Sequence, residues 1–190
     1  MKKLSLLMAS LLFLAACSND KAAEPVEEPK KQDAAVEEQD TAAEEQQELS
    51  EEGFITQVTA NQILVNNIYF TIPKDAKVSF KNGTDTTDGV VGDIRTGMKV
   101  SVDYTGPVKE TFPMEAEAQT VSILNDEASA EQSEALLAYI EGEQLSSLVI
   151  LGQPIVRDNE IGFLFNNMID GEMTEVRVNL DTHEYTVGGE

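Results

Sequence analysis

Apolar and polar residues alternate in short runs through residues 154–188, a pattern typical of β-strands with one buried face. The turn-forming pairs Asp158-Asn159 and Asp170-Gly171 separate the runs, and a four-residue turn is expected over 181–184. Counting outward from each turn places one set of apolar side chains on a common face. The expected pairs are Val156 with Ile161, Phe165 with Val176, Phe163 with Val178, Ile161 with Leu180, Leu180 with Tyr185, and Val178 with Val187. The pattern therefore predicts a four-stranded antiparallel meander.

A helical period precedes these strands. Apolar side chains recur three and four residues apart at Ala135, Leu136, Tyr139 and Ile140. The spacing predicts an amphipathic helix over about 130–141. Ser129 and Gln132 form a capping-box pattern at its start, and Gly142 stands where a helix would end. We expect the helix to cover the apolar face of the meander, so that residues 126–190 form an α+β module.

Shorter apolar runs fill residues 53–125. The expected strands are 54–58, 63–65, 68–72, 77–80, 98–104 and 119–124. The pair Asn66-Asn67 suits a two-residue hairpin turn, which pairs Val65 with Ile68. We expect a polar loop over 81–88 and a long strand connection over 106–118. Five or six short strands in a module of this size suit a small closed or nearly closed barrel.

This module also resembles a known family. The motifs that carry the resemblance are Gly53, Ile63-Leu64-Val65, Asp93-Ile94, Gly97-Met98, Val100, Gly106-Pro107-Val108, Glu110, Thr111-Phe112-Pro113, Glu115-Ala116 and Ala118. They are similar to a family of small exported lipoproteins of low-GC Gram-positive bacteria, known only as a domain of unknown function. The resemblance covers residues 53–125 alone and implies an OB-like barrel. The family often has Ser-Tyr-Pro and Gln where this chain has Thr111-Phe112-Pro113 and Glu115, which weakens any polar role at position 112. Residues 126–190 distantly resemble exported PepSY-type or cystatin-like domains, without a specific motif.

The first 16 residues have the pattern of a signal peptide. Lys2 and Lys3 precede the apolar run 4–14, which is shorter than the roughly 20 residues of a membrane-spanning helix. The following Leu14-Ala15-Ala16-Cys17 resembles the bacterial lipobox, which implies cleavage between Ala16 and Cys17 and a diacylglycerol on the Cys17 sulfur. The alternative is an ordinary secretory signal with a stray cysteine. Cys17 is the only cysteine, so no disulfide can form within the chain. We expect an extracytoplasmic protein held on the cell membrane by lipid, with the number of acyl chains left open.

Charge is distributed unevenly along the chain, whose formal net charge is −22. Residues 18–52 carry 13 acidic and 3 basic side chains and no aromatic residue. Such a composition predicts a disordered acidic tether over 17–52, with a partly helical stretch around 34–48 as the alternative. Residues 126–190 carry 14 acidic and only 2 basic side chains. This acidity argues against nucleic-acid binding, which needs a basic surface.

Little in the sequence indicates catalysis. His183 is the only histidine and falls in a predicted turn, so no multi-histidine metal site can form. No nucleophile elbow, phosphate-binding loop or dinucleotide fingerprint is present. Oxygen ligands for calcium are available, but without EF-hand spacing, and a solvated acidic face is the simpler interpretation; they are Asp85, Asp88, Asp170, Glu172 and Glu175. We therefore expect no enzyme, no cofactor and no metal.

Two apolar groups are candidate partner contacts. One is Phe112, Pro113 and Met114 in the long connection, where an ordinary strand connection is the alternative. The other is Leu164, Met168 and Met173 on the far face of the meander, which is either a docking patch for the first module or a partner, or a set of scattered surface residues.

The leading hypothesis is a non-enzymatic binding or adaptor module that contacts an envelope protein or polymer. A small hydrolase with paired carboxylates and an acidic cation-binding surface are the alternatives. The sequence does not indicate the oligomeric state.

Overall fold

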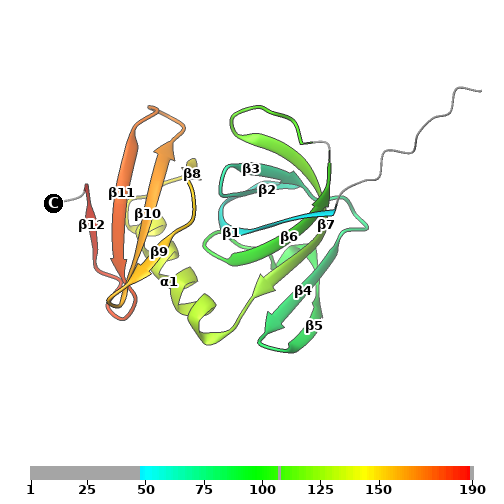
Figure 1. Ribbon diagram of the computed structural model, residues 1–190, viewed down its shortest axis with the longest axis horizontal. Helices are drawn as coiled ribbons and strands as arrows, with labels where there is room; N and C mark the ends of the chain where they lie inside the picture. Colours follow the sequence, from blue (N-terminus) through cyan, green and yellow to red (C-terminus); the bar gives the residue numbers. More distant parts are fainter. Residues whose placement is uncertain (1–47, 107, 189–190) are drawn as a thin grey trace, which may run out of the picture. The chain divides into compact units, whose positions relative to one another are not determined.

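The computed structural model describes residues 48–106 and 108–188, which form two β-sheets and one α-helix in one compact unit (Figure 1). The predicted signal peptide, the lipobox with Cys17 and the tether up to residue 47 lie outside the described residues. In the described part of the chain, no helix has the length and apolarity of a membrane span. The predicted class, a mostly β fold with an OB-like barrel followed by an α+β part, is confirmed.

The barrel is a ring of five strands. Its strands are β1 (Glu48–Val58), β2 (Gln62–Val65), β3 (Ile68–Thr71), β6 (Lys99–Thr105) and β7 (Met114–Leu124). The order is β3-β2-β1-β6-β7, and β3 then pairs in parallel with the first half of β7, which closes the ring. This is the arrangement of a small OB-like barrel. A hairpin of β4 (Lys77–Asn82) and β5 (Asp85–Gly89) continues the sheet from the second half of β7, and the short 3-10 helix η1 (Val91–Asp93) leads to β6.

The Asn66-Asn67 hairpin is confirmed, with Val65 opposite Ile68. Asn66 has a φ of 53°, and its side-chain Nδ2 donates to the backbone oxygen of Glu52 at 3.0 Å. A Cβ at Gly53 would lie 2.2 Å from Asn66 Oδ1, so only glycine leaves room for the Asn66 side chain in this position. The buried barrel residues also follow the predicted alternation of β6, in which Val100, Val102 and Tyr104 point inward.

Three boundaries in the barrel differ from the prediction. β5 takes up the second half of the predicted polar loop 81–88 and ends one residue beyond it, because an edge strand held by backbone bonds to β4 needs no apolar residues. β7 begins at Met114, inside the predicted long connection, where its parallel pairing with β3 is non-local and leaves no signal in the sequence. β1 begins at Glu48, so the last five residues assigned to the tether belong to a strand that pairs with β6.

The α+β part consists of the helix α1 (Glu127–Gly142) and a sheet. Its strands are β8 (Leu148–Ile150), β9 (Ile155–Arg157), β10 (Glu160–Asn167), β11 (Met173–Asn179) and β12 (Tyr185–Val187). The order across the sheet is β12-β11-β10, and β8 and β9 share the remaining edge of β10. The predicted apolar stripe of α1 is buried against the sheet together with Phe163, Phe165, Val176 and Val178.

The helix begins earlier than predicted. Asp126 is the N-cap, and its carboxylate accepts hydrogen bonds from the backbone N–H and the hydroxyl of Ser129. Ser129 is therefore a residue of the first turn, and the predicted capping box with Gln132 is wrong. The hydroxyl and N–H of Ser129 hold the pKa of Asp126 below its usual value, because both stabilise the ionised carboxylate.

One of the three predicted strand registers is confirmed and two are shifted by two residues. Asp158-Asn159 pairs Val156 with Ile161 as expected, although Val156 is exposed. The other observed pairs are Phe165 with Thr174, Phe163 with Val176, Ile161 with Val178, Val178 with Tyr185 and Val176 with Val187.

Asparagine side chains cause both shifts, because they close longer turns than the prediction assumed. Asn167 Oδ1 accepts from the N–H of Ile169, and Asn179 Oδ1 accepts from the N–H groups of Asp181 and Thr182. A shift of two residues returns each side chain to the same face, so the predicted buried face is still correct.

The barrel and the α+β part share contacts. Phe54 of β1 belongs to the core under the sheet, and its ring packs edge-to-face on Phe163 at 5.5 Å between centroids. Thr56 Oγ1 donates to the backbone oxygen of Leu148 at 2.6 Å, and the N–H of Ile150 donates to the backbone oxygen of Asn66 at 3.2 Å. The barrel therefore lies against the outer edge of β8.

Candidate binding site

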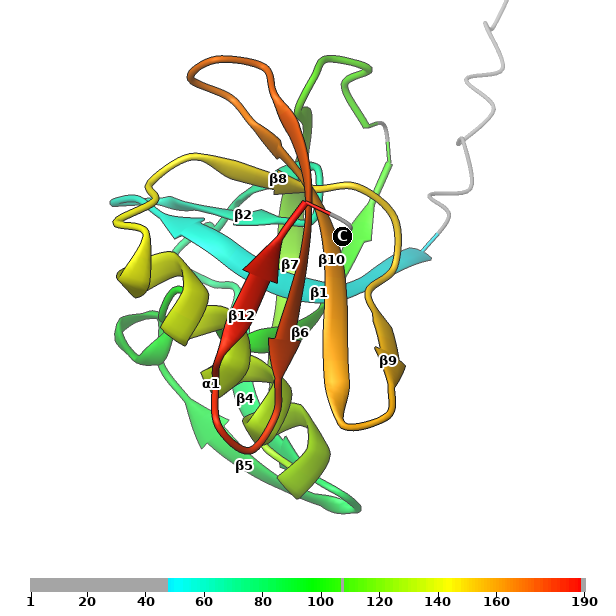
Figure 2. The same ribbon diagram turned by 90° about the vertical axis from the view of Figure 1, so that its left-hand side faces the viewer.

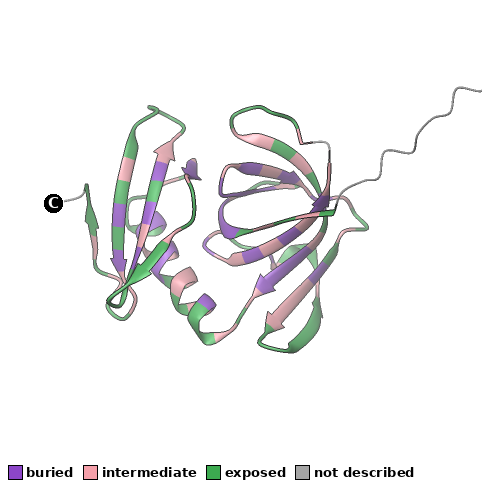
Figure 3. Cartoon of the chain, viewed as in Figure 1, coloured by how far each residue is buried: buried purple, intermediate pink, exposed green. Residues whose placement is uncertain are grey.

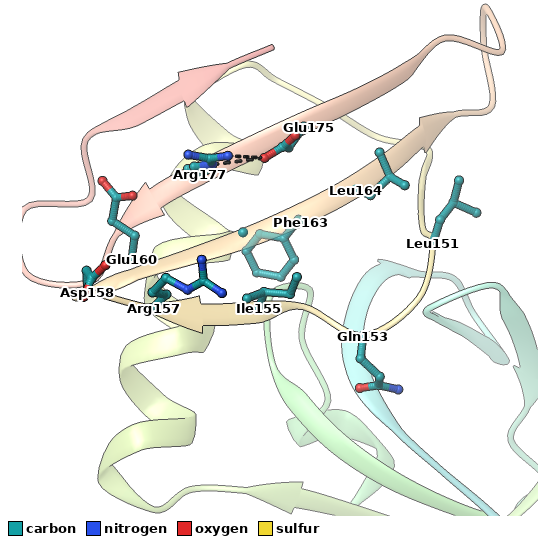
Figure 4. A pocket seen from close by; sticks show the side chains of 11 residues that line it. Leu151, Gln153, Ile155, Arg157, Asp158, Glu160, Phe163, Leu164, Glu175 and Arg177 are labelled. Carbon is teal, nitrogen blue, oxygen red and sulfur yellow. Dashed lines mark hydrogen bonds and ion pairs between the residues drawn. The ribbon is translucent and has the colours of Figure 1, made fainter. Parts of the chain in front are cut away.

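In Figure 2 the outer face of the α+β sheet is turned to the viewer and α1 lies behind the sheet. A hollow lies on this outer face (Figure 4). It forms because β8 and β9 leave a gap along β10. Chain segment 151–154 bridges this gap, and the N–H of Leu151 donates to the backbone oxygen of Leu164 at 2.8 Å. The hollow has a volume of about 640 Å³, within the roughly 300–1,000 Å³ of small-ligand sites. Its lining residues are Leu151, Gln153, Ile155, Arg157, Asp158, Glu160, Gly162, Phe163, Leu164, Glu175 and Arg177.

Gly162 leaves the middle of the hollow open. The ladders place it between Ile155 of β9 and Arg177 of β11. A Cβ at Gly162 would have only the backbone oxygen of Ile155 within 4 Å, at 3.6 Å. A larger side chain at position 162 would therefore extend into the hollow without disturbing the sheet.

The hollow gathers the basic residues of this part of the chain. Arg157 and Arg177 are the only two basic residues among 126–190, and both line it. Arg177 donates from Nε and Nη2 to Glu175 Oε1 at 3.0 and 2.8 Å. These hydrogen bonds, and the charge of the Glu175 carboxylate, raise the pKa of Arg177.

Arg157 differs from Arg177 because no carboxylate of the described residues forms an ion pair with it. Within residues 48–106 and 108–188, the guanidinium of Arg157 has no hydrogen bond or ion pair to another residue. A guanidinium presents five donors in a planar fork that matches a carboxylate. Exposed apolar groups of Ile155 and Leu164 lie on the same face of the sheet. The hollow thus offers an available cation beside apolar surface.

The structure divides the predicted far-face patch. Leu164 lines the hollow, whereas Met173, which is 69% exposed, and Met168 flank the β10–β11 turn and do not line it. The contacts with the barrel use Phe54, Thr56 and Asn66, so the barrel does not dock on this outer face.

The other predicted contact group is also divided. Phe112 is 61% exposed next to a cis peptide bond with Pro113, which is half-buried. Met114 starts β7 opposite Ile68 and packs against the barrel core. Phe112 alone of the three presents an open apolar surface.

Sequence reasoning missed Gly162, Ile155, Arg157 and Arg177 as site residues. One feature of the sequence could have indicated the site. Arg157 and Arg177, 20 residues apart, are the only arginine or lysine residues in 126–190. The shifted β10–β11 register hid the position of Gly162 opposite Arg177, whereas the pairing of Ile155 with Gly162 follows from the confirmed β9–β10 register.

The candidate oxygen ligands for calcium are not brought together. Asp85 and Asp88 lie on β5 of the barrel hairpin, and Glu175 is bound to Arg177. Asp170 accepts from the N–H of Glu172 and from Asn167 Nδ2. Among the described residues, no group of three or more potential ligands could hold a metal ion. His183 lies in the turn between β11 and β12, with a φ of 57°.

Compared with models of protein families, with curated proteins and with solved structures, the chain has no match. The resemblance of residues 53–125 to exported lipoproteins therefore stays a prediction.

Proposed function

We propose that this chain is a membrane-anchored, extracytoplasmic lipoprotein that acts as a non-enzymatic binding module of the cell envelope. The amino-terminal pattern ending at Cys17 supports the anchor. The hollow around Gly162 supports the binding role, and the observation that carries it is the position of Arg157 and Arg177. The partner is an envelope protein or polymer that carries a carboxylate or similar group beside apolar surface.

The net charge of the chain disfavours highly anionic ligands. A formal net charge of −22 repels polyanions at long range, so nucleic acids and other highly charged polymers are poor partners. A single anionic group on a mostly neutral segment meets less repulsion and can reach the Arg157 guanidinium, although Asp158 and Glu160 line the same hollow. Leu164 and Ile155 supply the apolar contact beside it.

The anchor is tested by mass spectrometry of the chain recovered from the membrane fraction. We expect a first residue Cys17 that carries a diacylglycerol. A chain with residues 1–16 attached, or with an unmodified Cys17 sulfur, contradicts the proposal.

The binding site is tested by photo-crosslinking in intact cells. A photoreactive amino acid at Leu164 should give a defined adduct, whereas the same group at Thr87, an exposed residue of β5, should not. Adding Gly162→Leu should abolish the adduct because the leucine fills the hollow. Equal adducts from positions 164 and 87, or an adduct that survives Gly162→Leu, would refute the site.

Hydrolysis by paired carboxylates is the second candidate, because Asp158, Glu160 and Glu175 also line the hollow. Glu175 is bound to Arg177, which leaves Asp158 and Glu160 for acid–base work. In that case Glu160→Gln would abolish turnover of the captured partner and leave the Leu164 adduct intact.

A further inference from the structure

β9 presents a free strand edge. In Figure 2, β9 and β12 are the two outer strands that flank β10 and β11. β9 pairs only with β10, and within the described residues no other strand pairs with it. β8, which shares the same edge of β10, has its outer side covered by the barrel through Thr56 and Asn66. Figure 3 shows the difference, with β8 buried and β9 exposed along its length.

The hydrogen bonding of the β9–β10 hairpin determines which groups point outward. Asp158 and Asn159 both have positive φ values, 50° and 66°, as in a two-residue type I′ turn. Arg157 and Glu160, which close this turn, are then a hydrogen-bonded pair, and Val156 with Ile161 is the next, non-hydrogen-bonded pair. The N–H and C=O of Val156 therefore point away from β10, toward the free edge.

β9 carries one exposed apolar side chain on each face. Ile155 is 64% exposed on the outer face, beside the hollow, and Val156 is 50% exposed on the inner face, beyond the cover of α1. The other outer strands lack this combination. β5 is polar throughout, and Tyr185 of β12 is half-buried and donates to Glu143 Oε1 at 2.8 Å.

We propose that β9 binds an extended peptide segment of a partner protein by strand addition. The backbone groups of Val156 hold the peptide, and its side chains pack on Ile155 and Val156. A carboxylate of the peptide pairs with Arg157, whose guanidinium has no ionic partner among the described residues. This inference rests on the proposed binding function and specifies how the partner is held.

Charge complementarity favours this occupant over a second copy of the chain. Two copies would each bring a formal net charge of −22, and β9 against β9 would also place Arg157 opposite Ile155. A neutral segment with one acidic residue satisfies Arg157 without that repulsion. Pro154 precedes β9 and limits the free edge to three residues, so the added strand is short. The peptide makes its other contacts with the residues that line the hollow.

The test uses the full chain in mild detergent and a short labelled peptide with the central triplet Glu-Val-Val between serines and threonines. In antiparallel alignment its Glu lies opposite Arg157 and its first Val opposite Val156. Binding is followed by fluorescence polarisation up to about millimolar protein, the weak limit of specific affinities. Methylation of the amide nitrogen of that first Val should weaken binding about tenfold, since one backbone hydrogen bond is lost.

A matched pair of protein variants tests the same edge. Val156→Pro removes the outward N–H without breaking a ladder bond to β10, and it should weaken binding about tenfold. Val156→Thr keeps the N–H and loses only part of the apolar contact, so it should weaken binding less than Val156→Pro does. Circular dichroism and the melting temperature establish that Val156→Pro is folded, and the methylated peptide tests the same bond with unaltered protein.

The outcomes separate this inference from the proposed function. No binding of the Glu-Val-Val peptide, or equal binding of its methylated form, overturns strand addition, whereas the Leu164 crosslink tests the binding role independently. Loss of binding with Gly162→Leu but not with Val156→Pro also overturns strand addition and leaves the hollow as the site. Self-association through β9, detected by sedimentation and removed by Val156→Pro, replaces the peptide with a second copy and overturns the proposal.

Discussion

β8 and β9 are two strands of three residues on the same edge of β10, yet their environments are opposite. Leu148, Val149 and Ile150 are all buried, whereas Ile155, Val156 and Arg157 are all exposed. Their sequences are similar: β8 is Leu-Val-Ile, and β9 is Ile-Val-Arg with one charged residue at its end. The difference arises from the barrel, which covers the outer edge of β8 and stops short of β9. Burial of an edge strand thus depends on what lies beside it more than on its own hydrophobicity.

We expect the largest effect on stability from Phe54, which packs in the core next to β8. Phe54→Ala removes a fully buried ring from the core that contains Leu148 and Ile150. We expect a loss of about 3–5 kcal/mol in the free energy of unfolding, measured in urea. The control Phe112→Ala removes an exposed ring and should change this free energy by less than about 0.5 kcal/mol. Similar losses from both variants would mean that Phe54 does not join the barrel to the sheet.

The hydrogen bond from Thr56 to Leu148 tests the edge of β8 directly. Thr56→Val keeps the shape of the side chain and leaves the Leu148 backbone oxygen buried without this donor. We expect unfolding to become easier by about 1–3 kcal/mol. On the uncovered strand, Val156→Thr should change stability by less than about 0.5 kcal/mol. An equal effect of the two substitutions would remove the distinction between the two edges.

Asp126 gives a smaller, pH-dependent effect on α1, the helix that shares a hydrophobic core with β8. Its pKa in the folded chain is below the ordinary 3.8, because Ser129 donates to the ionised carboxylate. The resulting stabilisation is present above the unfolded pKa and is lost as the pH falls through the lower, folded pKa. Asp126→Asn keeps a capping oxygen and removes the charge. The melting temperatures of the two proteins should therefore differ near neutral pH and converge in strong acid, and a constant difference would argue against this linkage.

Sequence periodicity predicted which faces are buried, because side-chain direction repeats every two residues regardless of register. It did not predict the register itself at two of the three turns of the α+β sheet, where Asn167 and Asn179 bond to the following backbone. The hollow depends on that register, since it requires Gly162 opposite Arg177, and so it was not predicted. The closure of the barrel by β3 and β7 also left no local signal, because parallel pairing joins residues far apart in the chain.

The early start of β1 has a mechanical consequence. Any pull transmitted along the residues before Glu48 enters the folded unit through a strand that pairs with β6 over seven successive positions, from Glu48 with Thr105 to Phe54 with Lys99. The same strand carries Phe54 into the second core and Thr56 to β8. Tension along the axis of β1 loads these seven pairs together in shear, so the first strand of the described unit is held by many hydrogen bonds at once.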